Sequence, residues 1–141
     1  MEDCVFCDPL APSSILYEDE VVMAFRDIHP RAAIHVLVIP KQHIKNTSEL
    51  TRSHVALVEY MLRIGKNVLA QQCEVLLVES TSETHIFGFH QAPFNSVNHL
   101  HLHCIVPPFA HWWDRFRYSE TSWISHFISA KSMIDQLVIY G

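Results

Sequence analysis

Three histidines alternate with apolar residues in the run HLHLHCI over residues 99–105. Successive side chains of a β-strand point to opposite faces, so this spacing places three imidazoles on one face and apolar side chains on the other. Three imidazoles on one face can bind a metal ion, or can combine a nucleophile with a proton relay. A solvated, histidine-rich strand is the alternative without chemistry, and the spacing makes it the weaker one even in a chain with 11 histidines.

Two cysteines, Cys4 and Cys7, lie near the N-terminus with two residues between them. In a reducing compartment this spacing favours metal binding or redox chemistry over a structural disulfide. Taken alone, the pair is a weak signal. The other two cysteines, Cys73 and Cys104, are expected to be ordinary core or surface thiols.

The elements that must position these residues are mainly strands. Residues 15–17 and 21–25 flank an acidic turn and predict a hairpin, with Asp27 just beyond its second strand. Residues 34–39 are rich in β-branched side chains and predict another strand, in which His35 is the only polar residue.

Apolar positions at three- and four-residue steps predict one long amphipathic helix over residues 50–72, with Ser48 as its N-cap. Residues 121–138 predict a last helix on the same ground. Residues 84–89 alternate and predict a strand, whereas residues 75–80 fit either a strand or a frayed helix end.

The composition indicates one globular domain. The chain has 141 residues, of which 49% are hydrophobic and 18% charged, and nothing in it indicates disorder or a linker that would divide it. A net charge of −5 argues against a nucleic-acid or membrane binder, because no overall positive field would attract a phosphate backbone. Apolar stretches are too short to span a bilayer and the N-terminus is acidic, so a cytosolic or nuclear protein is expected.

Several segments resemble the histidine triad (HIT) superfamily of nucleotide hydrolases and transferases. The run at 99–105 matches its His-φ-His-φ-His-φ-φ signature, and supporting segments precede it in the right order at residues 25–30, 35–43 and 95–97. The resemblance covers roughly residues 4–108. The two cysteines, the GFHxxPF run and a tryptophan-containing tail are most similar to the third branch of histidine triad nucleotide-binding (Hint) proteins, which is associated with adenosine 5'-monophosphoramidase activity.

The resemblance implies a catalytic role for each triad histidine. His101 is the expected nucleophile, with its Nδ1 proton held by the backbone carbonyl of His99 and its Nε2 free to attack phosphorus. His103 is expected to hydrogen-bond the phosphoryl or leaving-group oxygens, and His35 to complete the relay. Ser96 occupies the family position that hydrogen-bonds the leaving group.

Nucleotide binding is expected in the N-terminal half. Family likeness puts Asp27 on the ribose hydroxyls, with Phe25 and Ile28 as walls for the base. A turn-forming acid after a strand is the alternative for Asp27. Asn95 stands where glutamine is common in the family, and His90 stands where relatives often have a small amide residue, so its role is left open.

A structural zinc site is implied by the same resemblance. Some family members bind zinc through two such cysteines, the histidine after Pro-Lys-x and the first triad histidine, which here are Cys4, Cys7, His43 and His99. Such a site would pin residues 1–10 and would have no open position for water. Two free thiols beside a turn-capping histidine are the alternative. No organic cofactor is expected.

The expected fold is α+β: a single HIT domain over residues 1–141, with an antiparallel sheet of about five strands, one long helix and a C-terminal helical extension over residues 109–141. The tryptophans of the extension, Trp112, Trp113 and Trp123, either pack its helix onto the sheet or stack a base or the leaving group. Family likeness implies a homodimer in which the long helix and a sheet edge pair with their copies.

Three functions compete. The favoured one is hydrolysis of P–N bonds in adenosine 5'-phosphoramidates, with release of AMP through a His101 adenylate. A second is another HIT hydrolase, acting on dinucleoside polyphosphates, cap remnants or adenylated DNA ends, although the acidic balance makes a nucleic-acid partner unexpected. The third is a non-catalytic nucleotide-binding or scaffold protein.

Overall fold

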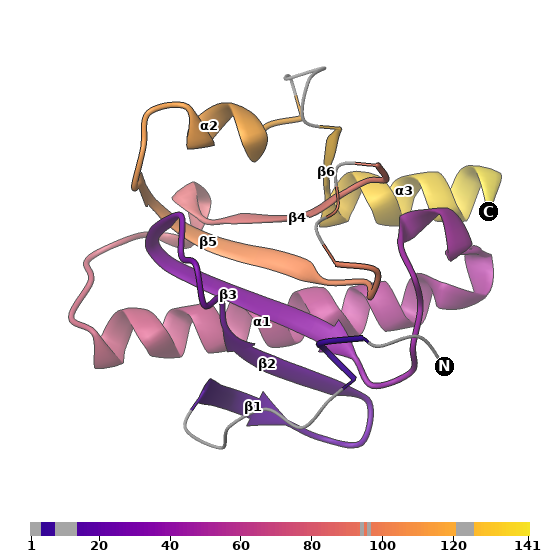
Figure 1. Cartoon of the computed structure of the whole chain (residues 1–141), viewed down its shortest axis with the longest axis horizontal. Helices are drawn as coiled ribbons and strands as arrows, with labels where there is room; N and C mark the ends of the chain where they lie inside the picture. Colours follow the sequence, from indigo (N-terminus) through magenta and orange to yellow (C-terminus); the bar gives the residue numbers. More distant parts are fainter. Residues whose placement is uncertain (1–3, 8–13, 94, 96, 121–125) are drawn as a thin grey trace.

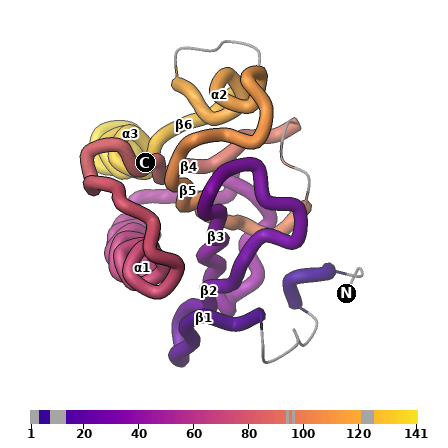
Figure 2. Tube along the Cα trace, turned by 90° about the vertical axis from the view of Figure 1, so that its left-hand side faces the viewer, coloured from indigo at the N-terminus to yellow at the C-terminus, as the bar shows by residue number. Residues whose placement is uncertain are grey.

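The computed structural model describes residues 4–7, 14–93, 95, 97–120 and 126–141. One sheet forms the centre of the protein, and the two longer helices cover one of its faces (Figures 1 and 2). Residues 4–7 lie on the opposite side of the sheet, as Figure 2 shows. Helix and sheet packed around a common core give the expected α+β architecture.

Within the described residues, the sheet has six antiparallel strands in the order β1-β2-β3-β5-β4-β6. Their bounds are β1 Ile15–Glu18, β2 Val22–Arg26, β3 Ala32–Pro40, β4 Ile86–His90, β5 Leu102–Phe109 and β6 Phe127–Ser129. The first five correspond to the strands that the sequence predicts, and the hairpin of β1 and β2 is confirmed. The sixth comes from the C-terminal extension, where the sequence predicts only helix.

The hairpin turn is fixed by one carboxylate. Asp19 accepts hydrogen bonds from the backbone N–H groups of Val21 and Val22, each at 2.8 Å. The hydroxyls of Tyr17 on β1 and Tyr60 on the long helix also donate to Asp19. Asp19 therefore joins the turn to the helix as well as closing it.

The two faces of β3 and β5 differ as the alternating sequence requires. Val36, Val38, Leu102 and Cys104 belong to the large core cluster that also contains the long helix. Leu37 pairs with His103 across the two strands and belongs to a separate apolar cluster. The imidazoles of β3 and β5 therefore lie on the face away from the helix.

The triad strand begins later than the sequence predicts. His99 and Leu100 precede β5, which starts at Leu102, directly after His101. The alternation nevertheless continues through this approach, because Leu100 belongs to the core cluster while His101 does not. The ladder with β3 starts only at Leu102, opposite Val38.

The long helix α1 (Val55–Val75) is confirmed, but its start is not at Ser48. Two short 3₁₀ turns, η2 (Thr47–Glu49) and η3 (Arg52–His54), come first. Asn46 caps η2 by accepting from the N–H of Ser48 at 2.9 Å, so the prediction of Ser48 as N-cap is wrong. Asn and Ser are comparable caps, and the apolar spacing does not separate a 3₁₀ turn from the helix that follows it.

The close packing of α1 on the sheet depends on a glycine. Gly65 lies in the middle of α1, and a Cβ there would be 2.7 Å from Cys104 Sγ on β5. Residues 76–81 after α1 form no strand, and a 3₁₀ turn, η4 (Ser82–Thr84), leads into β4. For residues 75–80 the sequence leaves a strand and a frayed helix end as alternatives. The helix end is the one observed, because α1 ends at Val75.

The prediction of one helix over residues 121–138 is wrong. Residues 121–125 lie outside the described residues, β6 follows, and the helix α3 (Ala130–Tyr140) begins only after Ser129, whose side chain accepts from the N–H of Ser132. Phe127 and Ile128 are both buried, and β6 pairs with β4 from Gly88 to His90. A segment of three residues is too short to show the alternation of a strand, so its pairing with β4 decides its structure.

The extension also contains a short helix, α2 (Asp114–Arg117), beside two exposed tryptophans. Trp112 is 69% exposed and Trp113 is 48% exposed, with the Trp113 ring stacked on His111. These two tryptophans do not pack α3 onto the sheet, and Trp123 lies outside the described residues. Instead α3 packs on α1 through Met133 and Leu137, which belong to the same core cluster as α1.

Among the described residues, no helix combines the length and the apolar character that crossing a membrane requires.

Candidate active site

His101 has the tautomer of a nucleophile. Its Nδ1–H donates to the backbone carbonyl of His99 at 2.7 Å, which assigns the proton to Nδ1 and leaves a lone pair on Nε2. The residue is 6% exposed, and burial lowers its pKa, so the ring is neutral near pH 7. A neutral imidazole with a free Nε2 can attack phosphorus.

His35 and His103 form a hydrogen-bonded pair whose proton positions follow from one backbone group. The N–H of Arg31 donates to His35 Nδ1 at 3.1 Å, so the proton of a neutral His35 must be on Nε2. His35 Nε2 in turn donates to His103 Nδ1 at 2.9 Å, which places the proton of His103 on Nε2. We call this pair the histidine relay.

The outer end of the relay is a buried donor without an acceptor. His103 Nε2 has no hydrogen-bond partner among the described residues, although it is inaccessible to solvent. Burial is the main cause that lowers the pKa of His103 well below its usual value, and the neighbouring histidines add to it. Leaving such a donor unpaired is costly, and an anionic oxygen bound beside it would satisfy it.

Asp27 lies against the relay. Its Oδ2 is 3.5 Å from His35 Nε2, while its Oδ1 accepts from the N–H of His29 at 2.9 Å. Burial lowers the pKa of His35 to about 4, and the charge of Asp27 opposes this shift. The residue predicted for the ribose hydroxyls is thus also the nearest carboxylate to the relay, and its bond to His29 agrees with the turn alternative as well.

The two residues predicted to wall the base lie in different surroundings. Phe25 is 4% exposed and contacts Phe6, with ring centres 5.3 Å apart, whereas Ile28 is 83% exposed. Phe6 also lies edge to face on His101, with 5.3 Å between ring centres. Sequence reasoning missed Phe6, although its position between Cys4 and Cys7 ties it to the predicted zinc segment.

The loop before the triad is described only in part. Ser96, predicted to act on the leaving group, lies outside the described residues. The side-chain amide of Asn95 donates to the Val97 carbonyl at 3.3 Å and to Asn98 Oδ1 at 3.1 Å. Asn95 thus orders its own loop.

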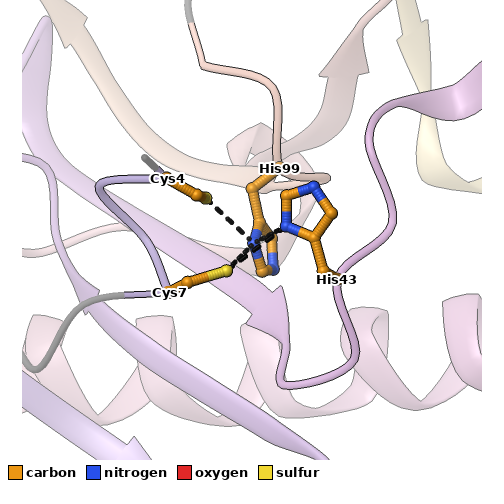
Figure 3. Close-up of side chains that lie close together, drawn as sticks. All are labelled: Cys4, Cys7, His43 and His99. Atoms are coloured by element: carbon orange, nitrogen blue, oxygen red, sulfur yellow. Dashed lines mark hydrogen bonds between the residues drawn. The ribbon is translucent and has the colours of Figure 1, made fainter. Parts of the chain in front are cut away.

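The four predicted zinc ligands come together (Figure 3). Nδ1 of His99 lies 3.4 Å from Sγ of Cys4, 3.4 Å from Sγ of Cys7 and 3.1 Å from Nδ1 of His43, and Cys7 Sγ is 3.3 Å from His43 Nδ1. Ligand atoms around tetrahedral zinc lie roughly 3.3–3.8 Å apart, so the four residues fit such an ion. His99 Nε2 donates to the Pro40 carbonyl at 2.8 Å, which leaves the Nδ1 lone pair directed at the cluster.

A second group, Asp27, His35 and His103, also has its ligand atoms within 4.8 Å of one another. The Arg31 N–H argues for a proton here and against a metal ion. It requires an acceptor at His35 Nδ1, and a metal at Nε2 would force a hydrogen onto Nδ1, where the two N–H groups would face each other. The hydrogen bonds thus distinguish the two groups. In the relay His35 Nδ1 accepts a hydrogen bond, whereas in the cysteine-histidine cluster His99 Nε2 donates one and its Nδ1 lone pair is left for a metal ion.

His90 and Tyr118 cover the relay. His90 Nε2 donates to the Arg117 carbonyl at 2.7 Å, and its ring centre is 4.9 Å from that of His103. The Tyr118 ring lies 5.3 Å from His103 and 5.6 Å from His35. Burial lowers the pKa of His90 to about 4, so this ring is also neutral near pH 7. No spacing in the sequence indicates Tyr118, because it comes from the extension.

The larger described cavities lie elsewhere. Cavities of about 630 and 550 Å³ are both lined by Lys66, His85 and Phe87. They lie near α1 and the start of β4, where β4 has no pairing with β6. None of the predicted site residues that the structure describes lines either cavity. The chemistry that the histidines can perform therefore belongs to the face opposite α1.

Comparison with known proteins places this arrangement in context. Residues 3–118 match the family model described as scavenger mRNA decapping enzyme C-term binding. The bifunctional adenosine 5'-phosphosulfate phosphorylase/adenylylsulfatase HINT4 of Arabidopsis thaliana is 37% identical, with 95% of this chain and 90% of that protein covered. The adenosine 5'-monophosphoramidase HINT3 of Xenopus tropicalis is 35% identical, with 95% and 86% covered.

A solved HIT family hydrolase from Clostridium thermocellum is 32% identical, with a TM-score of 0.61 and with 77% of this chain and 93% of that chain covered. The 14 kDa zinc-binding protein of Zea mays is 34% identical, with 67% of this chain and 71% of that protein covered. The aprataxin orthologue Hnt3, solved in complex with DNA, has a TM-score of 0.63 over 88% of this chain and 68% of that chain, at 21% identity, which shows a shared fold alone.

Proposed function

The chain belongs to the histidine triad (HIT) superfamily, and we propose that it hydrolyses P–N bonds at the α-phosphate of adenosine 5'-phosphoramidates. The proposal depends above all on the two opposite tautomers of the triad. His101 offers a lone pair at Nε2, while His103 offers a hydrogen at Nε2 without a partner among the described residues. A nucleophile beside a donor suits attack on a phosphoryl group whose oxygens gain negative charge.

In the first step, Nε2 of His101 forms a bond to the α-phosphorus and the P–N bond of the substrate breaks. The His103 Nε2–H donates to a non-bridging oxygen as charge develops there. The leaving nitrogen needs a proton to depart as an amine, and the Ser96 hydroxyl is the group that family position assigns to this contact. The products are an amine and His101 carrying AMP on Nε2.

In the second step, water attacks the same phosphorus and the bond to His101 Nε2 breaks, which releases AMP and restores the free imidazole. One proton of this water replaces the proton that the departing amine took in the first step. The Nδ1 bond to the His99 carbonyl is available throughout, so the ring keeps one orientation in both steps. Asp27 is proposed to bind the ribose hydroxyls, with Phe25 and Ile28 near the base and Asn95 ordering the adjoining loop.

We propose that Cys4, Cys7, His43 and His99 bind a structural zinc ion. The ligand spacing and the likeness to a zinc-binding protein support this assignment. When bound, the ion would pin the N-terminal segment, and with four protein ligands it would take no part in the bond changes.

Cleavage of adenosine 5'-phosphosulfate is the second candidate, because it is named for a relative 37% identical to this chain. Both reactions use the same attack on an adenylyl phosphorus. They differ in the leaving group, since sulfate departs without the proton that an amine needs. Dinucleoside polyphosphates, cap remnants and adenylated DNA ends stay as further substrates to test, and faster turnover of any of them than of the phosphoramidate would replace the P–N assignment.

The test compares AMP release from adenosine 5'-phosphoramidate, adenosine 5'-phosphosulfate and a dinucleoside polyphosphate at neutral pH. Wild-type protein is expected to turn over the phosphoramidate fastest, and the His101→Ala variant is expected to lose this activity by a factor of about 10³ or more. His85→Ala, which removes a histidine outside the site, is the matched control. When the reaction is stopped without acid, mass spectrometry of the protein is expected to find AMP bound to His101.

Tight AMP binding without turnover of any of the three compounds would instead support the non-catalytic alternative.

The homodimer also stays a prediction. β6 occupies the edge of β4 from Gly88 to His90, so the two edge strands that a partner copy could meet are β1 and β6. Light scattering on the eluted protein measures its mass, and a monomer would contradict the dimer.

A further inference from the structure

The tautomer of the relay depends on a loop residue. Arg31 precedes β3, and its backbone N–H donates to the side chain of His35 rather than to a neighbouring strand. If this N–H turned away, neutral His35 could carry its proton on either nitrogen, and the orientation of the bond to His103 would no longer be fixed. Whatever holds Arg31 therefore also holds the proton pattern of the relay.

The C-terminal extension holds Arg31 at two points. The N–H of Ala110 donates to the Arg31 carbonyl at 2.7 Å, which fixes the backbone on the side that follows the N–H. The Arg31 guanidinium lies 3.9 Å from Oδ1 of Asp114 at the start of α2. Both contacts come from residues just beyond the end of β5.

Asp114 is an unusual residue to find in this position. Its side chain is 0% exposed, and neither carboxylate oxygen has a hydrogen-bond partner among the described residues. Burial of a carboxylate without hydrogen bonds destabilises a fold, and here the described charge nearest to it is the guanidinium of Arg31. A costly buried group of this kind calls for an explanation other than stability.

We propose that Asp114 is a positioning residue for the histidine relay, because its charge holds Arg31 so that the Arg31 N–H stays on His35 Nδ1. The inference rests on the proposed function, in which the His103 Nε2–H meets a phosphoryl oxygen. Asp114 acts through Arg31 and His35, and it touches neither the substrate nor the reacting atoms.

A direct electrostatic effect on His35 explains the arrangement less well. Burial is the main cause that lowers the pKa of His35, and the charges of Arg31 and Asp114 act on that pKa in opposite directions. The two charges oppose each other at the ring, so the proposal assigns to Asp114 the geometry of the loop rather than a field on His35.

The test uses Asp114→Asn and Arg31→Met, with Asp135→Asn on the exposed face of α3 as the control. Long-range ¹H–¹⁵N spectra report which ring nitrogen of His35 carries the proton. Wild type and the control are expected to have it on Nε2 alone, whereas both variants are expected to show exchange between the two nitrogens. In turnover of adenosine 5'-phosphoramidate, kcat is expected to fall about tenfold in both variants, with KM changed by less than about twofold.

The double variant is expected to be no slower than the slower single variant, because both changes break one contact. A single Nε2 tautomer with wild-type kcat in both variants would overturn the proposal. Arg31 is 39% exposed, so Arg31→Met is expected to fold and to carry the test even where Asp114→Asn does not. If wild type turns over no nucleotide, the proposed function fails, and the spectra still decide the positioning role separately.

Discussion

Phe6 packs edge to face on His101, with 5.3 Å between their ring centres and an interplanar angle of 80°. Phe6 belongs to the turn between Cys4 and Cys7, whose sulfur atoms lie beside His43 and His99. The cysteine-histidine cluster and the proposed nucleophile are therefore joined by one aromatic side chain, as well as by the two-residue step from His99 to His101. A ligand set that looks purely structural is in contact with the site.

Replacement of Phe6 by alanine is expected to lower kcat/KM for adenosine 5'-phosphoramidate by about 2–10-fold, since edge-to-face aromatic pairs contribute roughly 0.5–1.5 kcal/mol. The loss arises because the His101 ring gains room to move away from its attacking orientation. Val5→Ala is the matched control, because Val5 lies in the same turn and is 56% exposed. Equal rates in Phe6→Ala and wild type would show that the contact does not orient His101.

Loss of the proposed zinc ion is expected to lower stability more than it lowers chemistry. Cys7→Ser should reduce bound zinc from one ion per chain to none and lower the melting temperature, because the metal contributes its binding energy to folding. Metal analysis and thermal unfolding measure the two quantities. Cys73→Ser, at a half-buried thiol outside the cluster, should keep the zinc and the melting temperature.

A Cys7→Ser protein that retains a full equivalent of zinc would contradict the assignment of the ligands. Full retention of both turnover and melting temperature after zinc removal would show that the N-terminal segment stays in place through Phe6 and its neighbours alone.

Acidification is expected to destabilise the protein between pH 6.5 and about 4. Burial lowers the pKa of His35 and of His90 from 6.5 to about 4, so in this window the unfolded chain binds protons that the folded chain does not. Above pH 6.5 both groups are neutral in the folded and in the unfolded chain, and the free energy of unfolding is at its full value. It falls as the pH falls below 6.5 and levels off below about 4. Each group contributes on the order of 1–3 kcal/mol.

His90→Gln isolates one of these groups. The glutamine amide can still donate to the Arg117 carbonyl but does not titrate. Urea unfolding at pH 7.5 and pH 4.5 is therefore expected to give a smaller loss of unfolding free energy in the variant than in wild type. An equal loss in the two proteins would mean that His90 is not buried as a neutral group.

Gly88→Ala is expected to detach β6 from β4. A Cβ at Gly88 would be 2.5 Å from the backbone oxygen of Ile128 and would also meet the Phe127 ring. Overpacking of this kind costs about 1–3 kcal/mol, and backbone contacts leave little room for adjustment. Amide hydrogen exchange is expected to accelerate at residues 127–129 while the β3–β5 ladder stays protected. Unchanged exchange in β6 would contradict this expectation.

The sequence predicts the parts of the fold and site that depend on local spacing. Alternation places His101 and His103 on one face, the long apolar period gives α1, and motif order brings Cys4, Cys7, His43 and His99 to one cluster. The first two features follow from a repeat within a short stretch of chain, whereas the four ligands, spread from residue 4 to residue 99, are expected from the family resemblance.

The remaining features depend on contacts between distant segments. Ser48 and the start of the last helix were misassigned because caps and short strands are chosen by tertiary packing. Tyr118 reaches the relay, and Asp114 reaches Arg31, only because the chain turns back after β5, and a single tyrosine or aspartate carries no spacing that marks it. The spacing of the residues at the centre of the site therefore does not predict which residues cover it.

Strand β6 and Tyr118 have a consequence for the order in which the protein is made. All three triad histidines leave the ribosome before Tyr118, which covers the relay, and before the residues that pair with β4. A growing chain that ends at residue 105 already carries the complete motif but still lacks Tyr118 and β6. Maturation of the site therefore waits for a segment that contains none of the residues of the motif.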